Sequence, residues 1–151
     1  MHDEGRGRPE TTRQVTRGAR RFLRASGYAV IAEAPLPNGL RADLLGLAGD
    51  GTLHIVEVKS SLGDWRADRK WTGYRDYCDR FYFAVPLELD ASPFPQEAGL
   101  IVADAHGAML ARDAPPLRLA PASRKAMLVR FGVLAAERYC ALAFGDERLE
   151  S

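Results

Sequence analysis

The sequence has few cysteines, no long apolar run and almost no net charge, and each of these absences excludes a class of protein. Its two cysteines, Cys78 and Cys140, form neither a CxxC pair nor a zinc-ligand spacing, which favours single buried thiols in a reducing cytosol. No apolar run approaches the roughly 20 residues that span a bilayer, and residues 1–8 lack the apolar core of a signal peptide. We therefore expect a cytoplasmic protein without a membrane partner.

The formal net charge is only +1, so any basic surface has to arise from local patterning. A length of 151 residues with 46% hydrophobic and 27% charged residues is typical of one globular domain with its own core. The polar start of the chain predicts a flexible N-terminal tail over residues 1–10. We place a single domain over residues 11–151.

Residues 11–26 have the pattern of an amphipathic helix, with Thr11 or Thr12 as its cap and Gly27 as its end. Its apolar face consists of Val15, Ala19, Phe22 and Leu23. The opposite face carries a stripe of arginines without a neighbouring acid, namely Arg13, Arg17, Arg20 and Arg24. Such a stripe is either a solvated face or a surface that binds DNA phosphates. Because all the charges on this helix are positive, the second interpretation is favoured.

The rest of the chain alternates short strands with turns before a C-terminal helix. Strands are predicted over residues 28–33, 41–48, 53–59, 81–85, 100–103 and 108–111, and the first three form an antiparallel meander. Residues 64–80 are partly helical, although Gly73 weakens a single long helix. A proline-rich loop that includes Pro121 precedes the last helix, which Ser123 is expected to cap. This order predicts an α/β fold with a central mixed β-sheet flanked by helices.

The candidate catalytic residues lie on the second and third predicted strands. Glu57 and Lys59 share one face of a strand because side chains alternate with period two, and isolated buried charges are costly. Asp43 and Glu57 can supply carboxylate ligands for Mg²⁺, with the backbone carbonyl of Val58 as a third oxygen. Lys59 can offset negative charge on a phosphate, so this set is sufficient for phosphodiester hydrolysis. The alternative is a surface Glu-x-Lys on an edge strand.

The turn between these strands determines whether the two carboxylates meet. Directly opposed residues of an antiparallel pair share a face. Asp43 opposes Glu57 if an odd number of residues, such as 49–51, closes the turn, whereas a two-residue loop would place them on opposite faces. The sequence Gly49-Asp50-Gly51 is typical of a three-residue turn with a glycine bulge, so it favours the register in which Asp43 opposes Glu57.

The chain resembles the PD-(D/E)XK nuclease superfamily in the order of its elements and in one sequence motif. The motif is Asp43, followed by thirteen residues and then by Glu57-Val58-Lys59-Ser60-Ser61. More closely, the chain is similar to the MmcB-like bacterial DNA-repair proteins in residues 41–43, 56–61, 64–71, 74 and 78–85, and residues 64–71 (DWRADRKW) are the specific part. The resemblance covers the chain after residue 11. It implies a restriction-endonuclease-like PD-(D/E)XK fold and a DNA-repair endonuclease that uses Mg²⁺ or Mn²⁺, with Asp43, Glu57 and Lys59 as catalytic residues.

Two positions depart from the superfamily pattern. Ala42 stands where the motif has a proline, at a loosely held position. Many relatives also carry an acid on the first helix, whereas residues 11–26 contain none. Glu10, just before that helix, or Glu33, on the first strand, is the candidate substitute as a metal ligand. If neither contributes, the chain is expected to bind DNA without cutting it.

Residues near the predicted site have supporting assignments. Arg41 and Lys70 are predicted to bind DNA phosphates together with the arginine stripe. Trp71 and Tyr74 lie three residues apart, which favours core packing over base stacking. Asp64 and Asp68 either pair locally with Arg66, Arg69 or Lys70, which is the favoured interpretation, or support the site. The residues placed around the site without contacting the metal are Asp64, Asp68, Trp71 and Tyr74.

Three functions stay open from the sequence. The favoured one is an active DNA nuclease; the others are a DNA-binding module of the same fold and an adaptor that recruits a repair enzyme. DNA is the expected partner, with RNA as an alternative, and a homodimer or a repair protein as a further partner. We expect the protein in the cytoplasm, associated with the nucleoid.

Overall fold

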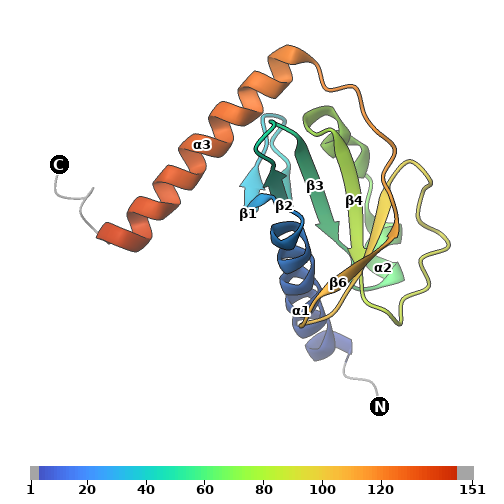
Figure 1. Cartoon of the computed structure of the whole chain (residues 1–151). Helices are drawn as coiled ribbons and strands as arrows, with labels where there is room; N and C mark the ends of the chain where they lie inside the picture. Colours follow the sequence, from blue (N-terminus) through green and yellow to red (C-terminus); the bar gives the residue numbers. More distant parts are fainter. Residues whose placement is uncertain (1–3, 146–151) are drawn as a thin grey trace.

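The computed structural model describes residues 4–145, with side chains from residue 9 onward. Its elements are α1 (Glu4–Ala25), β1 (Ala29–Pro35), β2 (Arg41–Leu47), β3 (Leu53–Val58), α2 (Leu62–Ala67), the 3₁₀ helix η1 (Trp71–Tyr77), β4 (Arg80–Val85), β5 (Gly99–Ala103), β6 (Ala108–Arg112) and α3 (Pro121–Phe144), as Figure 1 shows. Except for η1, this is the predicted order. No helix within the described residues is long and apolar enough to cross a membrane.

The six strands form one sheet in the order β1-β2-β3-β4-β5-β6. The first three strands are an antiparallel meander, β3-β4 and β4-β5 are parallel, and β5-β6 is antiparallel. Two parallel neighbours need a crossover connection, and α2 with η1 supplies the one between β3 and β4. The predicted mixed sheet flanked by helices is therefore confirmed.

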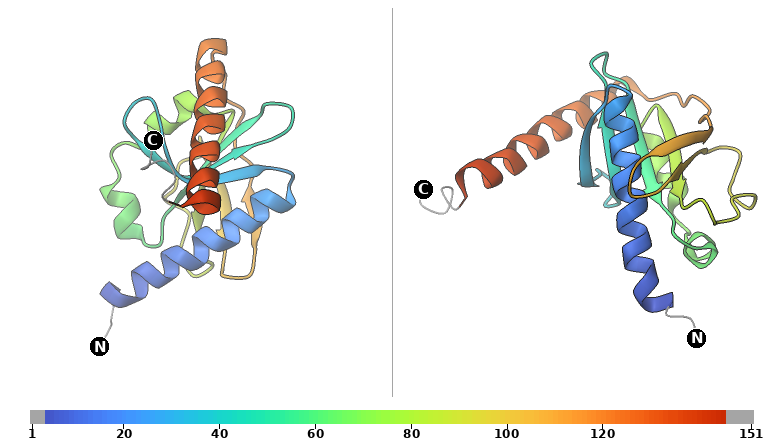
Figure 2. Two further views of the ribbon diagram at one scale, coloured as in Figure 1. Left: turned by 90° about the vertical axis from the view of Figure 1, so that its left-hand side faces the viewer. Right: turned by 60° about the horizontal axis from the view of Figure 1, so that its bottom comes forward.

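Helix α1 covers one face of the sheet (Figure 2). Its buried residues Val15, Ala19 and Leu23 pack in one cluster with Leu44 of β2 and Val56 of β3, so the predicted apolar face is confirmed. The helix passes very close to the β5–β6 turn at Gly18, where an added Cβ would lie 2.0 Å from the carbonyl oxygen of Asp104. Only glycine fits this approach.

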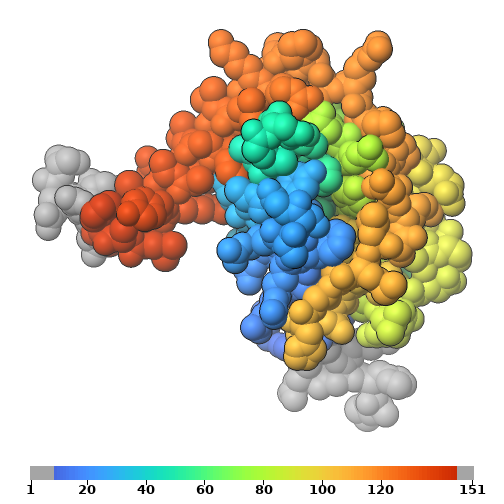
Figure 3. Space-filling view, in the orientation of Figure 1, coloured from blue at the N-terminus to red at the C-terminus, as the bar shows by residue number. Residues whose placement is uncertain are grey.

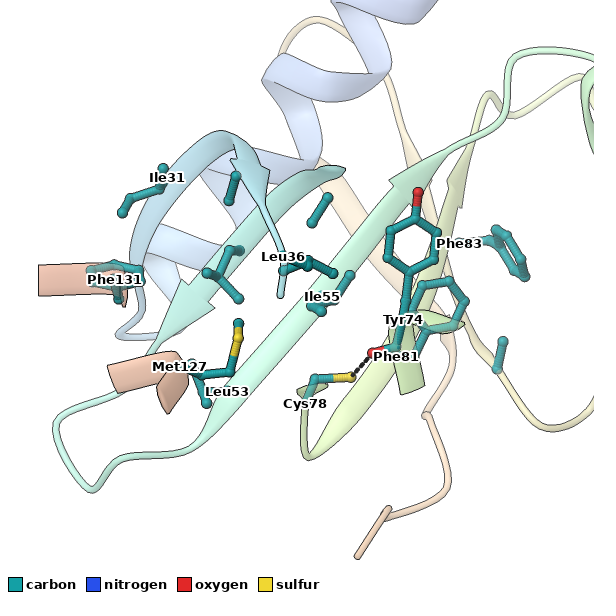
Figure 4. Packing of buried hydrophobic residues seen from close by; sticks show 14 of the residues in the cluster. Ile31, Leu36, Leu53, Ile55, Tyr74, Cys78, Phe81, Phe83, Met127 and Phe131 are labelled. Carbon is teal, nitrogen blue, oxygen red and sulfur yellow. Dashed lines mark hydrogen bonds between the residues drawn. The ribbon is translucent and has the colours of Figure 1, made fainter. Parts of the chain in front are cut away.

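The opposite face of the sheet packs against η1 and the first half of α3, as the close-up in Figure 4 shows. Ile55 of β3 and Phe83 of β4 meet Tyr74 of η1, while Met127 and Phe131 are the buried residues of α3. Neighbouring strand residues alternate between faces, so Asp43, Glu57 and Lys59 belong to this second face, away from α1.

The start of α1 differs from the prediction. The helix begins at Glu4, so the expected flexible tail is helical over residues 4–10, and neither Thr11 nor Thr12 is its cap. Residues 1–3 lie outside the described residues. Glycine and proline at positions 5, 7 and 9 argued against a helix here, but extending an existing helix costs much less than nucleating one. Gly27 does follow the end of the helix, with a φ of 94°.

The start of α3 also differs. The helix begins at Pro121 with Ala120 as the N-cap, so Ser123 lies inside the helix and does not cap it. Proline is favoured at the first helical position because its φ already suits a helix and it has no N–H to satisfy. Arg138 donates to the backbone carbonyl oxygens of Ala32 and Glu33 on β1, and beyond it the end of α3 stands clear of the sheet in Figures 1 and 3. Cys140 lies on that end and is exposed, against the prediction of two buried thiols, whereas Cys78 is buried.

Candidate metal and nucleic-acid site

Asp43 and Glu57 lie opposite each other on β2 and β3. Residues 49–51 close the turn with Gly51 at a φ of 91°, and the pairing of Leu44 with Val56 places the carboxylates in register, as predicted. Each carboxylate also bonds the neighbouring backbone. Glu57 Oε1 accepts from the N–H of Asp43 at 2.7 Å, and Asp43 Oδ2 accepts from the N–H of Val58 at 2.8 Å. These bonds fix both side chains at the edge of the core.

Glu57 is buried, with 6% of its surface exposed. Burial first, and then the negative charge of Asp43, raises the pKa of Glu57 to about 8. Burial also raises the pKa of Asp43. At neutral pH the pair therefore retains a proton on Glu57 unless a cation compensates the second negative charge.

Lys59 is held by an ion pair with Asp68 at the end of α2. Lys59 Nζ lies 2.7 Å from Asp68 Oδ2, and the two side chains are 13% and 3% exposed. Burial alone would raise the pKa of Asp68, but hydrogen bonds from Lys59 and from the N–H of Lys70 outweigh it and lower the pKa. Asp68 thus orients the ammonium group of Lys59.

Tyr74 joins the core to the site. Its ring is buried and stacks on Phe81 with an interplanar angle of 3°, which confirms the core packing expected for it. Its hydroxyl donates to the carbonyl oxygen of Arg41 at 3.3 Å and lies close enough to the Glu57 carboxylate to lower the pKa of Glu57 in part. Trp71 also packs in the core, 6.0 Å from Phe81 between ring centroids. The contact between Tyr74 and Glu57 was missed from the sequence, because residue spacing does not show which way a phenol points.

A pocket of about 670 Å³ opens above these groups. Asp43, Glu57, Val58, Lys59 and Asp68 line it, and so do the predicted DNA-binding residues Arg41 and Lys70. The arginine stripe of α1 is not part of the lining. Its four arginines are exposed on the outer side of α1, which covers the other face of the sheet.

A hydroxyl network that the sequence did not indicate ties α1 to the end of β3. The Thr12 hydroxyl donates to Ser60 at 3.0 Å, and the Ser60 hydroxyl donates to Asp64 Oδ2 at 3.0 Å. Asp64 therefore supports the segment that follows Lys59. Thr12 and Ser60 lie 48 positions apart, so no local pattern could have predicted their contact.

The two candidate additional acids do not line the pocket. Glu10 bonds Arg13 and Gln14, and Glu33 lies 3.9 Å from Arg41. Among the described side chains, no group of three or more histidine, cysteine or acidic residues is placed to hold a metal. Mg²⁺ typically takes one or two protein carboxylates and completes its shell with water and substrate phosphate, so the pair of Asp43 and Glu57 fits Mg²⁺ without a third acid.

The fold and the site define an α/β protein whose six-stranded mixed sheet, flanked by helices, carries two opposed carboxylates, an arrangement consistent with the restriction-endonuclease-like fold expected from the sequence. Within that class the chain belongs to the MmcB-like family: the family model "DNA repair protein MmcB-like" matches residues 2–145. None of the curated proteins compared matches the sequence.

Two solved structures are similar. A protein of unknown function from Silicibacter pomeroyi, SPO1766, has 41% sequence identity and a TM-score of 0.85, over 90% of this chain and 93% of that chain. A repair endonuclease from Pyrococcus abyssi has 20% identity and a TM-score of 0.31, over 45% of this chain and 33% of that chain. The similarity to the Pyrococcus abyssi protein is too limited to define a common fold.

Proposed function

We propose that this chain is a metal-dependent endonuclease that hydrolyses phosphodiester bonds in DNA, with Mg²⁺ or Mn²⁺ as its cofactor. The observation that carries the proposal is the Asp43–Glu57 pair. Burial at the edge of the apolar core raises the pKa of both carboxyl groups, and the negative charge of Asp43 raises the pKa of Glu57 further. A divalent cation removes that penalty, so the arrangement suits a metal site better than a structural contact.

Asp43 and Glu57, with the carbonyl of Val58, would hold the ion, which when bound would activate water and neutralise charge on the phosphate. Lys59 lines the same pocket and presents its ammonium group to charge that develops on the phosphate oxygens. Asp68 keeps that group in place through the ion pair of 2.7 Å. Asp68 is therefore a positioning residue.

Arg41 and Lys70 would hold the DNA backbone at the mouth of the pocket, because both line it and both are exposed. The α1 arginines lie on the other face of the sheet and would contact the duplex away from the scissile bond. The family's place in DNA repair supports DNA as the substrate.

A DNA-binding module without catalysis is the second candidate, and a specific observation favours it. Neither Glu10 nor Glu33 lines the pocket, so the ligand set ends with two carboxylates. In that case Arg41 and Lys70 would bind backbone phosphates in a salt-dependent manner, and Lys59 would be one more phosphate contact.

Cleavage assays separate the two functions. Branched DNA, single-stranded DNA and RNA are incubated with Mg²⁺, Mn²⁺ or a chelator, and binding to each is measured in parallel. The nuclease predicts metal-dependent cleavage that Lys59→Met abolishes and that Lys125→Met, an exposed change outside the pocket, leaves intact. Salt-sensitive binding without cleavage in either metal would establish the binding module instead.

A further inference from the structure

The second half of α3 carries apolar side chains that nothing else among the described residues covers. Every residue over positions 136–144 is exposed except the half-buried Arg138, and all but two of the nine are apolar or aromatic. Tyr139 is 64% exposed, Leu142 89% and Phe144 54%. Figure 3 shows this end of the helix standing free of the body. A helix that is apolar on several sides is normally buried.

A continuous apolar seam also runs along the whole helix, on the side away from Met127 and Phe131. Its members recur at alternating intervals of four and three residues and are all exposed: Ala122, Ala126, Val129, Val133, Ala136, Cys140 and Ala143. This is the heptad spacing at which two helices pack side by side. Small and β-branched side chains at these positions allow the two backbones to approach closely.

A groove lies beside the first half of this seam. It has a volume of about 740 Å³, and Pro35 and Pro37 at the end of β1 form one wall. Ala126, Val129 and Val133 of α3 form the other wall. The groove is thus next to the half of α3 that packs on the sheet, while the uncovered half extends beyond it.

We propose that this surface binds a second copy of the chain, with the two α3 helices antiparallel along the seam in a twofold-symmetric dimer. In this arrangement Val133 packs against Ala136 of the second copy, and Val129 against Cys140 of the second copy. The seam side of the uncovered half of each helix lies over the groove of the other copy, so one contact buries the seam and the groove, while Leu142 on the opposite side of α3 stays exposed. Such reciprocity is what a twofold interface requires.

The charges beside the seam specify this orientation. Arg130 and Glu137 flank the seam on the same side, seven residues apart. An antiparallel pair places Arg130 of each copy beside Glu137 of the other, which gives two symmetric ion pairs. A parallel pair would instead bring Lys125 close to Arg130 of the second copy, with like charges. The 24 residues of α3 span about 36 Å, enough for several heptad layers.

Sedimentation equilibrium tests the dimer. The wild type should have twice the chain mass of 16.6 kDa. Val133→Arg places a charge in the seam and should give the monomer mass, whereas Leu142→Arg adds the same charge on the opposite side of α3 and should leave the dimer. Both side chains are exposed, so neither change should unfold the chain. A wild type that stays monomeric at high concentration, or equal dissociation by the two variants, would overturn the proposal.

Cross-linking and charge reversal test the register. Oxidised Val129→Cys protein should form an intermolecular disulfide with Cys140, while the wild type should not, because antiparallel helices keep the two Cys140 residues apart. Efficient cross-linking of wild-type Cys140 would indicate a parallel pair and contradict the geometry. Arg130→Glu alone should weaken the dimer, and Arg130→Glu combined with Glu137→Arg should restore it. If the double variant does not restore the dimer, the proposed ion pairs between Arg130 and Glu137 do not form.

Discussion

Glu57 and Asp43 are joined across β2 and β3 by a hydrogen bond of 2.7 Å from the backbone N–H of Asp43 to the Glu57 carboxylate. The Asp43 carboxylate returns a bond to β3, at Val58. Because backbone groups hold both carboxylates, their positions do not depend on a bound ion. Preorganised ligands lose little conformational entropy when a metal binds.

The first prediction concerns metal affinity and pH. A metal displaces the proton that Glu57 holds, because the pKa of Glu57 is about 8 without metal. Affinity for Mn²⁺ should therefore rise with pH by up to about tenfold per unit below pH 8 and level off above it. Calorimetry in buffers of different ionisation enthalpy should detect one proton released per ion. A pH-independent affinity between pH 6 and 8 would contradict the assignment of Glu57.

The second prediction concerns stability without metal. The folded pKa of Glu57, about 8, exceeds the unfolded value of 4.5, so its contribution to stability is full below the unfolded value and is lost as pH rises through about 8. The melting temperature should fall by several degrees from pH 5 to pH 8 in chelator. Glu57→Gln stays neutral and should flatten the profile, whereas Glu88→Gln, an exposed control, should not. Saturating Mg²⁺ should reverse the loss in the wild type and in Glu88→Gln, and should have no such effect in Glu57→Gln.

The third prediction concerns Asp68. Asp68→Asn removes the charge that holds Lys59 and should lower the free energy of unfolding by about 2 kcal/mol. Cleavage should fall because the ammonium group is no longer held at the pocket. Asp90→Asn, in an exposed turn, serves as the control and should change the unfolding free energy by less than about 0.5 kcal/mol. Lys59→Met with Asp68→Leu should be less destabilised than Asp68→Asn, since no charge is left unpaired.

The fourth prediction separates the two basic surfaces. Arg41→Ala and Lys70→Ala should weaken DNA binding and cleavage together, because both residues line the pocket. Arg20→Ala and Arg24→Ala should each reduce the salt dependence of binding, by about one unit in the logarithmic slope, with less effect on cleavage of saturated DNA. Fluorescence anisotropy over a salt series measures this. If the salt dependence of binding does not change in these variants, the arginines of α1 form a solvated face that does not contact DNA.

The fifth prediction concerns the approach of α1 to the β5–β6 turn. Alanine normally stabilises a helix relative to glycine by up to about 1 kcal/mol. Gly18→Ala should do the opposite and cost about 1–3 kcal/mol, since its Cβ would lie 2.0 Å from the Asp104 carbonyl. Gly132→Ala has nothing within 4 Å and should be neutral or stabilising. Denaturant unfolding of both variants is the measurement; a stabilised Gly18→Ala would show that the contact relaxes freely.

The sheet and the carboxylate pair were predictable because local rules determine them. Alternation placed Glu57 and Lys59 on one face, and the three-residue turn around Asp50 set the register that brings Asp43 opposite Glu57. The helix boundaries were less predictable. Glu4 and Pro121 begin helices whose first residues are poor or ambiguous helix formers, and packing further along the chain stabilises them.

Contacts between distant segments could not be predicted from the sequence. The ion pair of Lys59 with Asp68 and the bond from Thr12 to Ser60 depend on how α1 and α2 sit against the end of β3. The exposure of Cys140 likewise depends on where α3 leaves the sheet, since its apolar sequence alone predicts burial. The same apolar sequence, once seen to be uncovered, is what indicates a second copy.

Calorimetric titration of Mn²⁺ at pH 8, with uncleavable DNA bound to the wild type and to Asp43→Asn, tests the central claim most directly. Asparagine keeps the size of the side chain and removes its charge, so the fold should survive. We predict one strong Mn²⁺ site in the wild type and its loss in Asp43→Asn, with DNA affinity largely retained. Equal Mn²⁺ binding in both proteins, or none in either while DNA is bound, would contradict a metal site at Asp43 and Glu57 and leave DNA binding as the function of the pocket.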